Sequence, residues 1–270
     1  MHLEFEFIIA FLLLGSIVGF MAGLLGIGGG GIMVPVLSSL FFALGMPVEK
    51  VIHLALGTSM ASIIVTSISS LRAHHGRGAV LWEYVKGMSP GIIVGTFMAT
   101  YVVALASSLA LAVFFSLFMG FVAVKMFIDK KPMSYEKPSG NKHMFSVGSG
   151  IGAISALVSI GGGSLTVPYL VWRNINIKKA IGTSAAIGLP ISLVGTLGYV
   201  INGWQNTSMH EYIFGFVYLP AVFLISITSF IFAPLGAKMA HQLPVTILKK
   251  VFAVLLITLS LKMLFSVMYS

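Results

Sequence analysis

The sequence predicts an all-α, polytopic membrane protein that consists of two inverted-topology repeats of five segments each. Of its 270 residues, 57% are hydrophobic and only 9% are charged, whereas about a quarter of the residues of a soluble domain are charged. The apolar residues fall into ten runs, and a glycine-rich stretch of ten residues interrupts the runs once in each half. These observations favour a chain that lies almost wholly in a membrane.

The ten runs are separated by short polar turns and by one longer polar segment. In the first repeat, residues 1–128, the runs are 6–25, 32–44, 53–71, 85–105 and 109–127. Residues 129–143 contain two prolines and several lysines and are predicted to be a linker. In the second repeat, residues 144–270, the runs are 145–158, 165–172, 179–201, 212–238 and 245–265.

Two runs are too short to cross a bilayer. At 1.5 Å per residue, 32–44 reaches roughly 20 Å and 165–172 roughly 12 Å, against about 30 Å of hydrocarbon. We interpret both as half-helices that return from a glycine tip buried near the middle of the membrane. The alternative is a full crossing whose glycine loop reaches the surface. The chain therefore has eight full spans plus two short glycine-broken half-helices, or ten spans.

The repeat is visible in several motifs. Residues 26–35 (GIGGGGIMVP) and 159–168 (SIGGGSLTVP) are identical at six of ten positions, and the GTS of 57–59 recurs at 182–184. Pro90 is matched with Pro220, and Lys125-Met126 with Lys262-Met263. Paired segments interrupted by glycine and proline at corresponding places in two halves are typical of transporter binding sites.

Charge predicts the orientation. If the N-terminus faces outside, all sixteen basic residues except Lys50 and Lys262 fall on the inner side, as the positive-inside rule requires. Both termini are then outside, the linker is cytoplasmic, and the membrane is the cell inner (plasma) membrane. The net charge of +9 is explained by these short loops, and no basic helix with interleaved aromatic residues suggests a nucleic-acid partner.

The glycine tips are the candidate substrate site. A helix N-terminus offers unpaired N–H groups and a partial positive charge, and successive N–H groups of a glycine-rich turn can surround an anion. The alternative is that the glycines permit close helix packing while the hydroxyls satisfy neighbouring backbone groups. The predicted binding residues are Gly28, Gly29, Gly30, Gly31, Thr58, Ser59, Gly161, Gly162, Gly163, Ser164, Thr183 and Ser184.

The titratable residues favour an anion pathway. Every aspartate and glutamate lies at the end of a predicted span or in a loop, whereas proton- and cation-driven pumps usually carry buried carboxylates. His53, His74 and His75 lie near span ends. They are interfacial polar residues or, alternatively, groups that couple a proton or recruit substrate.

No catalytic pattern accompanies the tips. Neither a P-loop lysine nor a Gly-x-Ser-x-Gly or His-Glu-x-x-His motif is present. The chain has no cysteine, so thiolate metal ligands and nucleophiles are absent. We therefore predict a protein that is not an enzyme and that has neither a cofactor nor a metal site.

The doubled Gly-x-Gly-Gly-Gly pattern with its proline, followed by Gly-Thr-Ser, resembles the sulfite exporter TauE/SafE family, also called the toluene-sulfonate uptake permeases. The resemblance covers nearly the whole chain, with Ser159 and Ser164 in place of glycines as modest departures. It implies membrane transport of sulfur oxyanions, organosulfonates or related small organic anions.

The predicted function is secondary transport of a small anion by alternating access, with the lipid bilayer and the anion as partners. An anion channel and a membrane-embedded enzyme are the alternatives. Coupling to a proton or sodium ion, the direction of transport and a homo-oligomeric state are left open by the residues.

Overall fold

A computed structural model of the chain describes residues 4–26, 28–128 and 140–242, together with seven residues between 254 and 265. The predicted linker up to residue 139 and most of the predicted run 245–265 lie outside the described residues. The predicted match of Lys125-Met126 with Lys262-Met263 falls partly on them as well.

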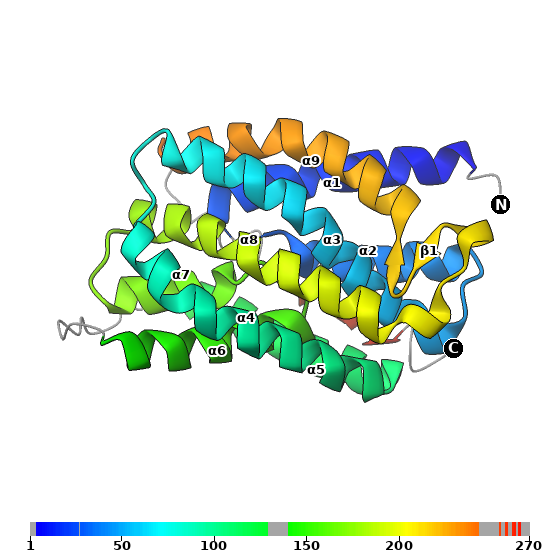
Figure 1. The fold of residues 1–270 in the computed structure, drawn as a ribbon. Coiled ribbons are helices and arrows are strands. Elements are labelled where there is room, and N and C mark those ends of the chain that lie inside the picture. The colour runs from blue at the N-terminus through cyan, green and yellow to red at the C-terminus, as the bar shows by residue number, and fades with distance from the viewer. Residues whose placement is uncertain are drawn as a thin grey trace.

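The described chain is almost entirely helical (Figure 1). Its helices are α1 (Phe5–Leu25), α2 (Gly30–Ala43), α3 (Val48–His75), α4 (Trp82–Leu105), α5 (Ser108–Ile128), α6 (Asn141–Leu157), α7 (Gly163–Trp172), α8 (Ile177–Asn202) and α9 (Leu219–Ala240). Between α8 and α9 lie two 3₁₀ turns, η1 (Trp204–Asn206) and η2 (Met209–Glu211), and an antiparallel hairpin, β1 (Ile213–Phe214) with β2 (Val217–Tyr218). Within the described residues, α1, α3, α4, α8 and α9 are long and apolar enough to span a membrane. The prediction of an all-α membrane protein with several spans is therefore confirmed.

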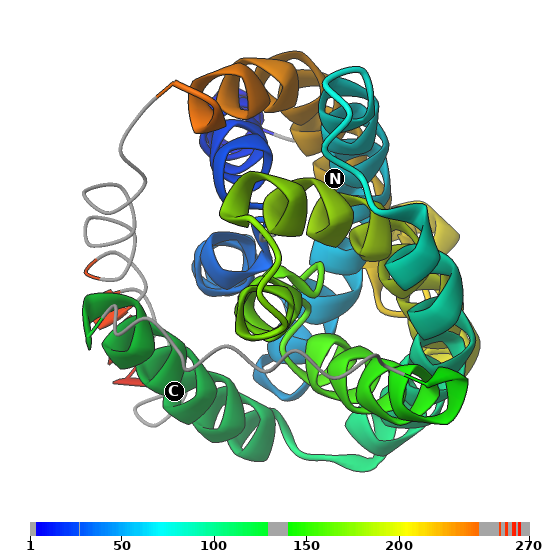
Figure 2. The same ribbon diagram turned by 90° about the vertical axis from the view of Figure 1, so that its left-hand side faces the viewer.

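Two short helices lie inside the bundle. After α1 the chain reverses, and α2 returns toward the end at which α1 began (Figure 1). Viewed along the bundle, α2 and α7 lie within the ring of longer helices (Figure 2). With 14 and 10 residues, they are about 21 Å and 15 Å long. Both are shorter than the hydrocarbon core, which is about 30 Å thick.

The two halves of the chain pack against each other. Helix α1 lies along α9, α4 lies along α6, and α3 contacts α8. Glycines make the close approaches: Gly15, Gly19 and Gly23 of α1 face the backbone of α9, and Gly91 and Gly95 of α4 face that of α6. Small residues at such contacts let helix backbones approach closely within a membrane.

Three predicted boundaries differ from the structure. The run predicted to begin at 212 becomes helical only at Leu219, because residues 213–218 pair as the hairpin and Gly215 turns it with φ +60°. Helix α3 extends to residues 48–75, beyond the predicted 53–71, and α6 begins at Asn141, inside the predicted linker.

The proposed match of Pro90 with Pro220 is wrong. Pro90 is the ninth residue of α4, whereas Pro220 is the second residue of α9. The missing N–H of proline is harmless in a first turn, where no intrahelical partner exists, but in a helix interior it removes one hydrogen bond. The two prolines therefore occupy physically different positions.

The basic residues gather at one end of the bundle. Helices α3 and α9 finish, and α4, α6 and α8 begin, at the end opposite to the start of α1 (Figure 1). Accordingly Arg72 and Arg77 after α3, Lys142 in α6, Lys178 in α8 and Lys238 in α9 all lie there. We call this end of the molecule the basic end.

Candidate functional site

The two glycine tips meet in the interior of the bundle. A Cβ added at Gly28 would lie 2.7 Å from both the Cα and the N atom of Gly161, and the nearest other side chain is Ile63 of α3. Ile63 is the sixteenth of the 28 residues of α3, so the contact lies near the middle of that helix. The described tip glycines are buried. Within the described residues the tips therefore lie inside the bundle, and their depth in the membrane stays a prediction.

Positive φ angles shape both tips. Gly28 and Gly29 have φ +73° and +78°, and Gly162 has φ +76°. Glycine adopts this left-handed region without the steric penalty that a side chain incurs. Ser159 also lies there, with φ +48°, and its Oγ donates a hydrogen bond of 2.8 Å to the carbonyl oxygen of Leu56. Gly29 and Gly162 are the N-cap residues of α2 and α7.

The start of α7 retains free donors. The carbonyl oxygen of Gly162 accepts hydrogen bonds from the N–H groups of Leu165 and Thr166. Among the described residues, no backbone oxygen accepts from the N–H of Gly163 or Ser164, as expected for the first turn of a helix. The Oγ of Ser164 is buried and also has no partner among them.

Both predicted threonines accept hydrogen bonds from backbone N–H groups and do not line the cavity described below. The Oγ1 of Thr58 accepts a hydrogen bond of 3.0 Å from the N–H of Tyr218, immediately before α9. The Oγ1 of Thr183 accepts one of 2.9 Å from the N–H of Leu81, immediately before α4. Equivalent residues of the two GTS motifs thus cap the starts of two long helices in the opposite halves.

The serines that follow them differ from each other. The Oγ of Ser184 donates a hydrogen bond of 2.6 Å to the carbonyl oxygen of Gly26 and so fastens the first tip to α8. The Oγ of Ser59 is buried without a partner in the described structure. Only one of these two hydroxyls is therefore available to another group.

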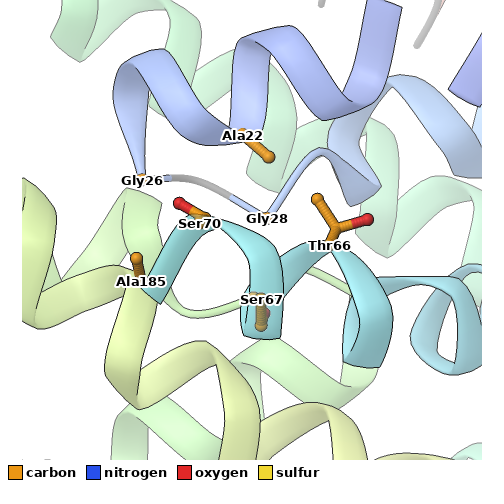
Figure 3. Close-up of a pocket in the computed structure, with 8 residues that line it drawn as sticks. Ala22, Gly26, Gly28, Thr66, Ser67, Ser70 and Ala185 are labelled. Carbon is orange, nitrogen blue, oxygen red and sulfur yellow. The ribbon is translucent and has the colours of Figure 1, made fainter. Parts of the chain in front are cut away.

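A small cavity adjoins the tip contact (Figure 3). Its volume is about 10 Å³, roughly the space that one water molecule requires. Residues of α3 form one wall, opposite the end of α1 and Ala185 of α8. The lining residues are Ala22, Gly26, Gly28, Thr66, Ser67, Ser70, Gly161 and Ala185. Of these, the glycines at 28 and 161 were predicted from the sequence.

The α3 hydroxyls were not predicted. Thr66, Ser67 and Ser70 follow Ile63 in the direction of the basic end, and their spacing places them on one side of the helix. Thr66 donates to the Oγ of Ser229 at 2.9 Å, whereas the Oγ of Ser70 is buried without a partner among the described residues. A cluster of hydroxyl residues inside an otherwise apolar run was the signal available in the sequence.

Apolar side chains fill the other side of the tip contact. Met60 lies one turn before Ile63 in α3, and its Cγ, Cε and Sδ atoms would lie 2.8–3.1 Å from a Cβ added at Gly195 of α8. Ile191 packs against Gly162. The small cavity therefore adjoins the tips on the side of the basic end, and side chains occupy the space on the opposite side.

His53 and His75 do not reach the tips. The Nε2 of His53 lies 3.1 Å from the carbonyl oxygens of Val103 and Ala106, at the end of α4. His75 is exposed, and its Nδ1 accepts a hydrogen bond of 3.4 Å from the Nε1 of Trp82. Both rings therefore have partners far from the cavity.

His74 lies closer to the first tip. Its ring is fully buried, and its Nε2 is 2.9 Å from the carbonyl oxygen of Gly23, near the end of α1. Its ring centroid is 5.6 Å from that of His241, whose carbonyl oxygen accepts a hydrogen bond of 3.1 Å from the Nζ of Lys178. No group of three or more potential metal-ligating side chains occurs among the described residues.

Similarity to known proteins extends over nearly the whole chain. The sequence profile of the family described as "Sulfite exporter TauE/SafE" matches residues 11–263. A protein of Haemophilus influenzae named "Probable membrane transporter protein" is 38% identical over 260 residues, which cover 96% of this chain and 98% of that protein. Proteins of Methanocaldococcus jannaschii and Bacillus subtilis, also named probable membrane transporter proteins, are 29% and 27% identical. They match 89% and 90% of this chain, and 90% and 92% of their own lengths. No solved structure gives a significant match.

Proposed function

Because the chain belongs to the sulfite exporter TauE/SafE family of membrane transporters, we propose that it carries a small oxyanion across the membrane by alternating access around its two glycine tips. The substrate class is sulfite, an organosulfonate or a related sulfur or carboxylate anion. The family description supports the sulfur compounds within that set.

The meeting of the two buried tips is the observation that carries this proposal. Each tip begins a helix, α2 at Gly30 and α7 at Gly163, and each helix N-terminus bears a partial positive charge. One such terminus stabilises an anion by about 0.3–1 kcal/mol when exposed and by up to about 2 kcal/mol when partly buried. The residues that line the adjoining cavity include three hydroxyl-bearing residues of α3 and no carboxylate. The two helix N-termini therefore contribute partial positive charge at the tips, which favours an anion over a cation there.

Two matched sets of contacts support inverted repeats. Helix α1 packs along α9 as α6 packs along α4, and Thr58 holds the start of α9 as Thr183 holds the start of α4. In secondary transporters of this kind, one repeat rocks against the other around a site at their interface. Because the cavity accommodates about one water molecule, binding of an oxyanion requires the surrounding helices to separate.

The orientation forms part of the proposal. The basic end of the molecule would face the cytoplasm, because cytoplasmic loops carry an excess of lysine and arginine. The start of α1 would then face outside. In this orientation the α3 hydroxyls of the cavity lie on the cytoplasmic side of the tip contact, in a cell inner (plasma) membrane.

Uptake into proteoliposomes tests the function. The panel consists of labelled sulfite, methanesulfonate, a small carboxylate, chloride and an amine. We expect saturable flux and counterflow for oxyanions. Uptake confined to the amine, or chloride flux that neither saturates nor supports counterflow, would contradict the proposal.

A matched pair of serines tests the site. Ser70→Ala removes a hydroxyl that has no protein partner among the described residues, so we expect little change in stability. A hydrogen bond to a charged group contributes about 1.5–3 kcal/mol, so we expect the affinity for the anion to fall at least about tenfold. Ser69→Ala is the control, because its Oγ binds the carbonyl oxygen of Phe230 in α9 instead. If both variants bind the anion equally well, the α3 hydroxyls do not form the site.

A further inference from the structure

A polar stripe of α3 connects the cavity with a buried histidine. Ser67, Ser70 and His74 are spaced i, i+3 and i+7, which places them on the same face of a helix. His74 therefore follows the cavity-lining Ser70 by about one turn, or roughly 6 Å along the helix axis. Its side chain is fully buried.

The hydrogen bond of His74 identifies its tautomer. A backbone carbonyl oxygen only accepts hydrogen bonds, so the contact with Gly23 assigns a proton to Nε2. The other ring nitrogen, Nδ1, is buried and has no partner among the described residues. In the neutral ring this nitrogen carries a lone pair and can take up one proton.

The end of α1 favours a positive charge at this position. Gly23 lies in the last turn of α1, which ends at Leu25, and a carbonyl in a last turn lacks an intrahelical partner. The C-terminus of a helix carries a partial negative charge. The Gly23 carbonyl therefore both orients the His74 ring and stabilises its imidazolium form.

Burial of the ring, which disfavours its charged form, and the neighbouring charged groups act in the opposite direction. The groups around His74 are His241 after α9, Arg77 in the turn after α3 and Lys178 in the first turn of α8. Burial, together with Arg77 and Lys178, lowers the pKa of His241, so that ring is held neutral at pH values where an ordinary histidine would be charged. Protonation of His74 would add another positive charge beside Arg77 and Lys178, which is unfavourable unless a negatively charged ligand binds nearby.

We propose that His74 takes up one proton when an anion enters the tip cavity, so that the anion and a proton are bound together. The proton comes from the solution and forms the N–H bond at Nδ1; no bond of the anion changes. The anion supplies the negative charge that the cluster of His241, Arg77 and Lys178 lacks. This inference rests on the proposed function and assigns the proton as the coupling ion of the same site.

Calorimetric titration of the detergent-purified full-length protein measures the coupling. The probe is methanesulfonate, because a sulfonate remains ionised at neutral pH and any proton taken up then belongs to the protein. Titrations in buffers of different ionisation enthalpy give the number of protons bound with each anion. We expect net proton uptake, and an affinity that rises by up to about tenfold for each unit by which the pH falls through the titration of His74.

Two histidine variants locate the proton. His74→Gln keeps an N–H group that can donate to the Gly23 carbonyl but cannot become charged, so proton uptake and the pH dependence should disappear. His75→Gln is the matched control: it changes the exposed neighbouring histidine and should retain both. The melting temperature of each variant shows whether it is folded.

The remaining outcomes separate the two proposals. If wild-type protein binds methanesulfonate without proton uptake, or if folded His74→Gln retains the uptake, the role of His74 is refuted while the proposed function stands. If sulfite binds but methanesulfonate does not, the proton uptake of wild type is compared with that of His74→Gln, both titrated with sulfite. Protons that sulfite itself binds or releases are the same in both titrations and cancel in the difference. If neither of these anions nor the small carboxylate of the uptake panel binds, the proposed function fails and this inference fails with it.

Discussion

Replacing Gly28 with alanine tests the contact between the two tips. The added Cβ would lie 2.7 Å from the Cα and N atoms of Gly161, whereas carbon atoms in ordinary contact are about 3.5–4.0 Å apart. The tips would have to separate by about 1 Å. Gly28 also has φ +73°, a conformation that costs a residue with a side chain on the order of 1 kcal/mol or more.

These two effects give the expected magnitude. Overpacking of a tight contact typically costs about 1–3 kcal/mol, so with the backbone strain we expect Gly28→Ala to lower the free energy of unfolding by about 2–4 kcal/mol. Gly161→Ala should cost less, about 1–2 kcal/mol, because its Cβ would lie 3.0 Å from Gly28 and its φ is not positive. Transport should decrease in the same order.

Gly150→Ala is the matched control for both variants. Gly150 lies in α6, and nothing lies within 4 Å of a Cβ added there. Alanine should therefore stabilise the helix by about 0.5–1 kcal/mol. Gly15 of α1 could not serve as such a control, because a Cβ added there would clash with the α9 backbone. Thermal unfolding in detergent and proteoliposome uptake provide the measurements. A Gly28→Ala protein as stable and active as wild type would refute the tip contact.

Three further experiments test a hydrogen bond of the first tip, the role of His53 and the orientation of the chain. Ser184→Ala leaves the buried carbonyl oxygen of Gly26 without its hydrogen bond and should lower the free energy of unfolding by about 1–3 kcal/mol. Ser59→Ala removes a hydroxyl that has no partner among the described residues, so it should lower the free energy of unfolding by less in the same melting assay. His53→Leu leaves two carbonyl oxygens at the end of α4 without their donor, so we expect a lower melting temperature with an unchanged pH dependence of anion affinity. A single cysteine at Gly140 of this cysteine-free chain should react with an impermeant maleimide only after cells are permeabilised; labelling in intact cells would reverse the proposed orientation.

Local sequence determined the membrane class and most of the helices. The first run was predicted at 6–25 and α1 is Phe5–Leu25, because twenty apolar residues in succession form a helix in lipid whatever surrounds them. The positions of the tips were also local, since Gly29 and Gly162 cap α2 and α7 at corresponding places in the two motifs.

Local sequence was insufficient where an apolar run did not become a helix. Residues 213–218 are as apolar as a helix start, yet they form a hairpin. The N–H of Tyr218 is satisfied there by Thr58, which lies 160 residues earlier in the chain. A partner so distant in sequence leaves no periodicity from which the hairpin could be predicted.

The availability of each hydroxyl was decided by the tertiary structure alone. Thr58, Thr183 and Ser184 have the residue types of an anion site, but each is bound to backbone more than 100 residues away. Ser70 was not predicted, yet it lines the cavity and its Oγ has no partner within the described part of the chain. Composition and spacing determine which polar groups are buried in the membrane, whereas the packing of one half against the other determines which of them find a protein partner and which remain for a ligand.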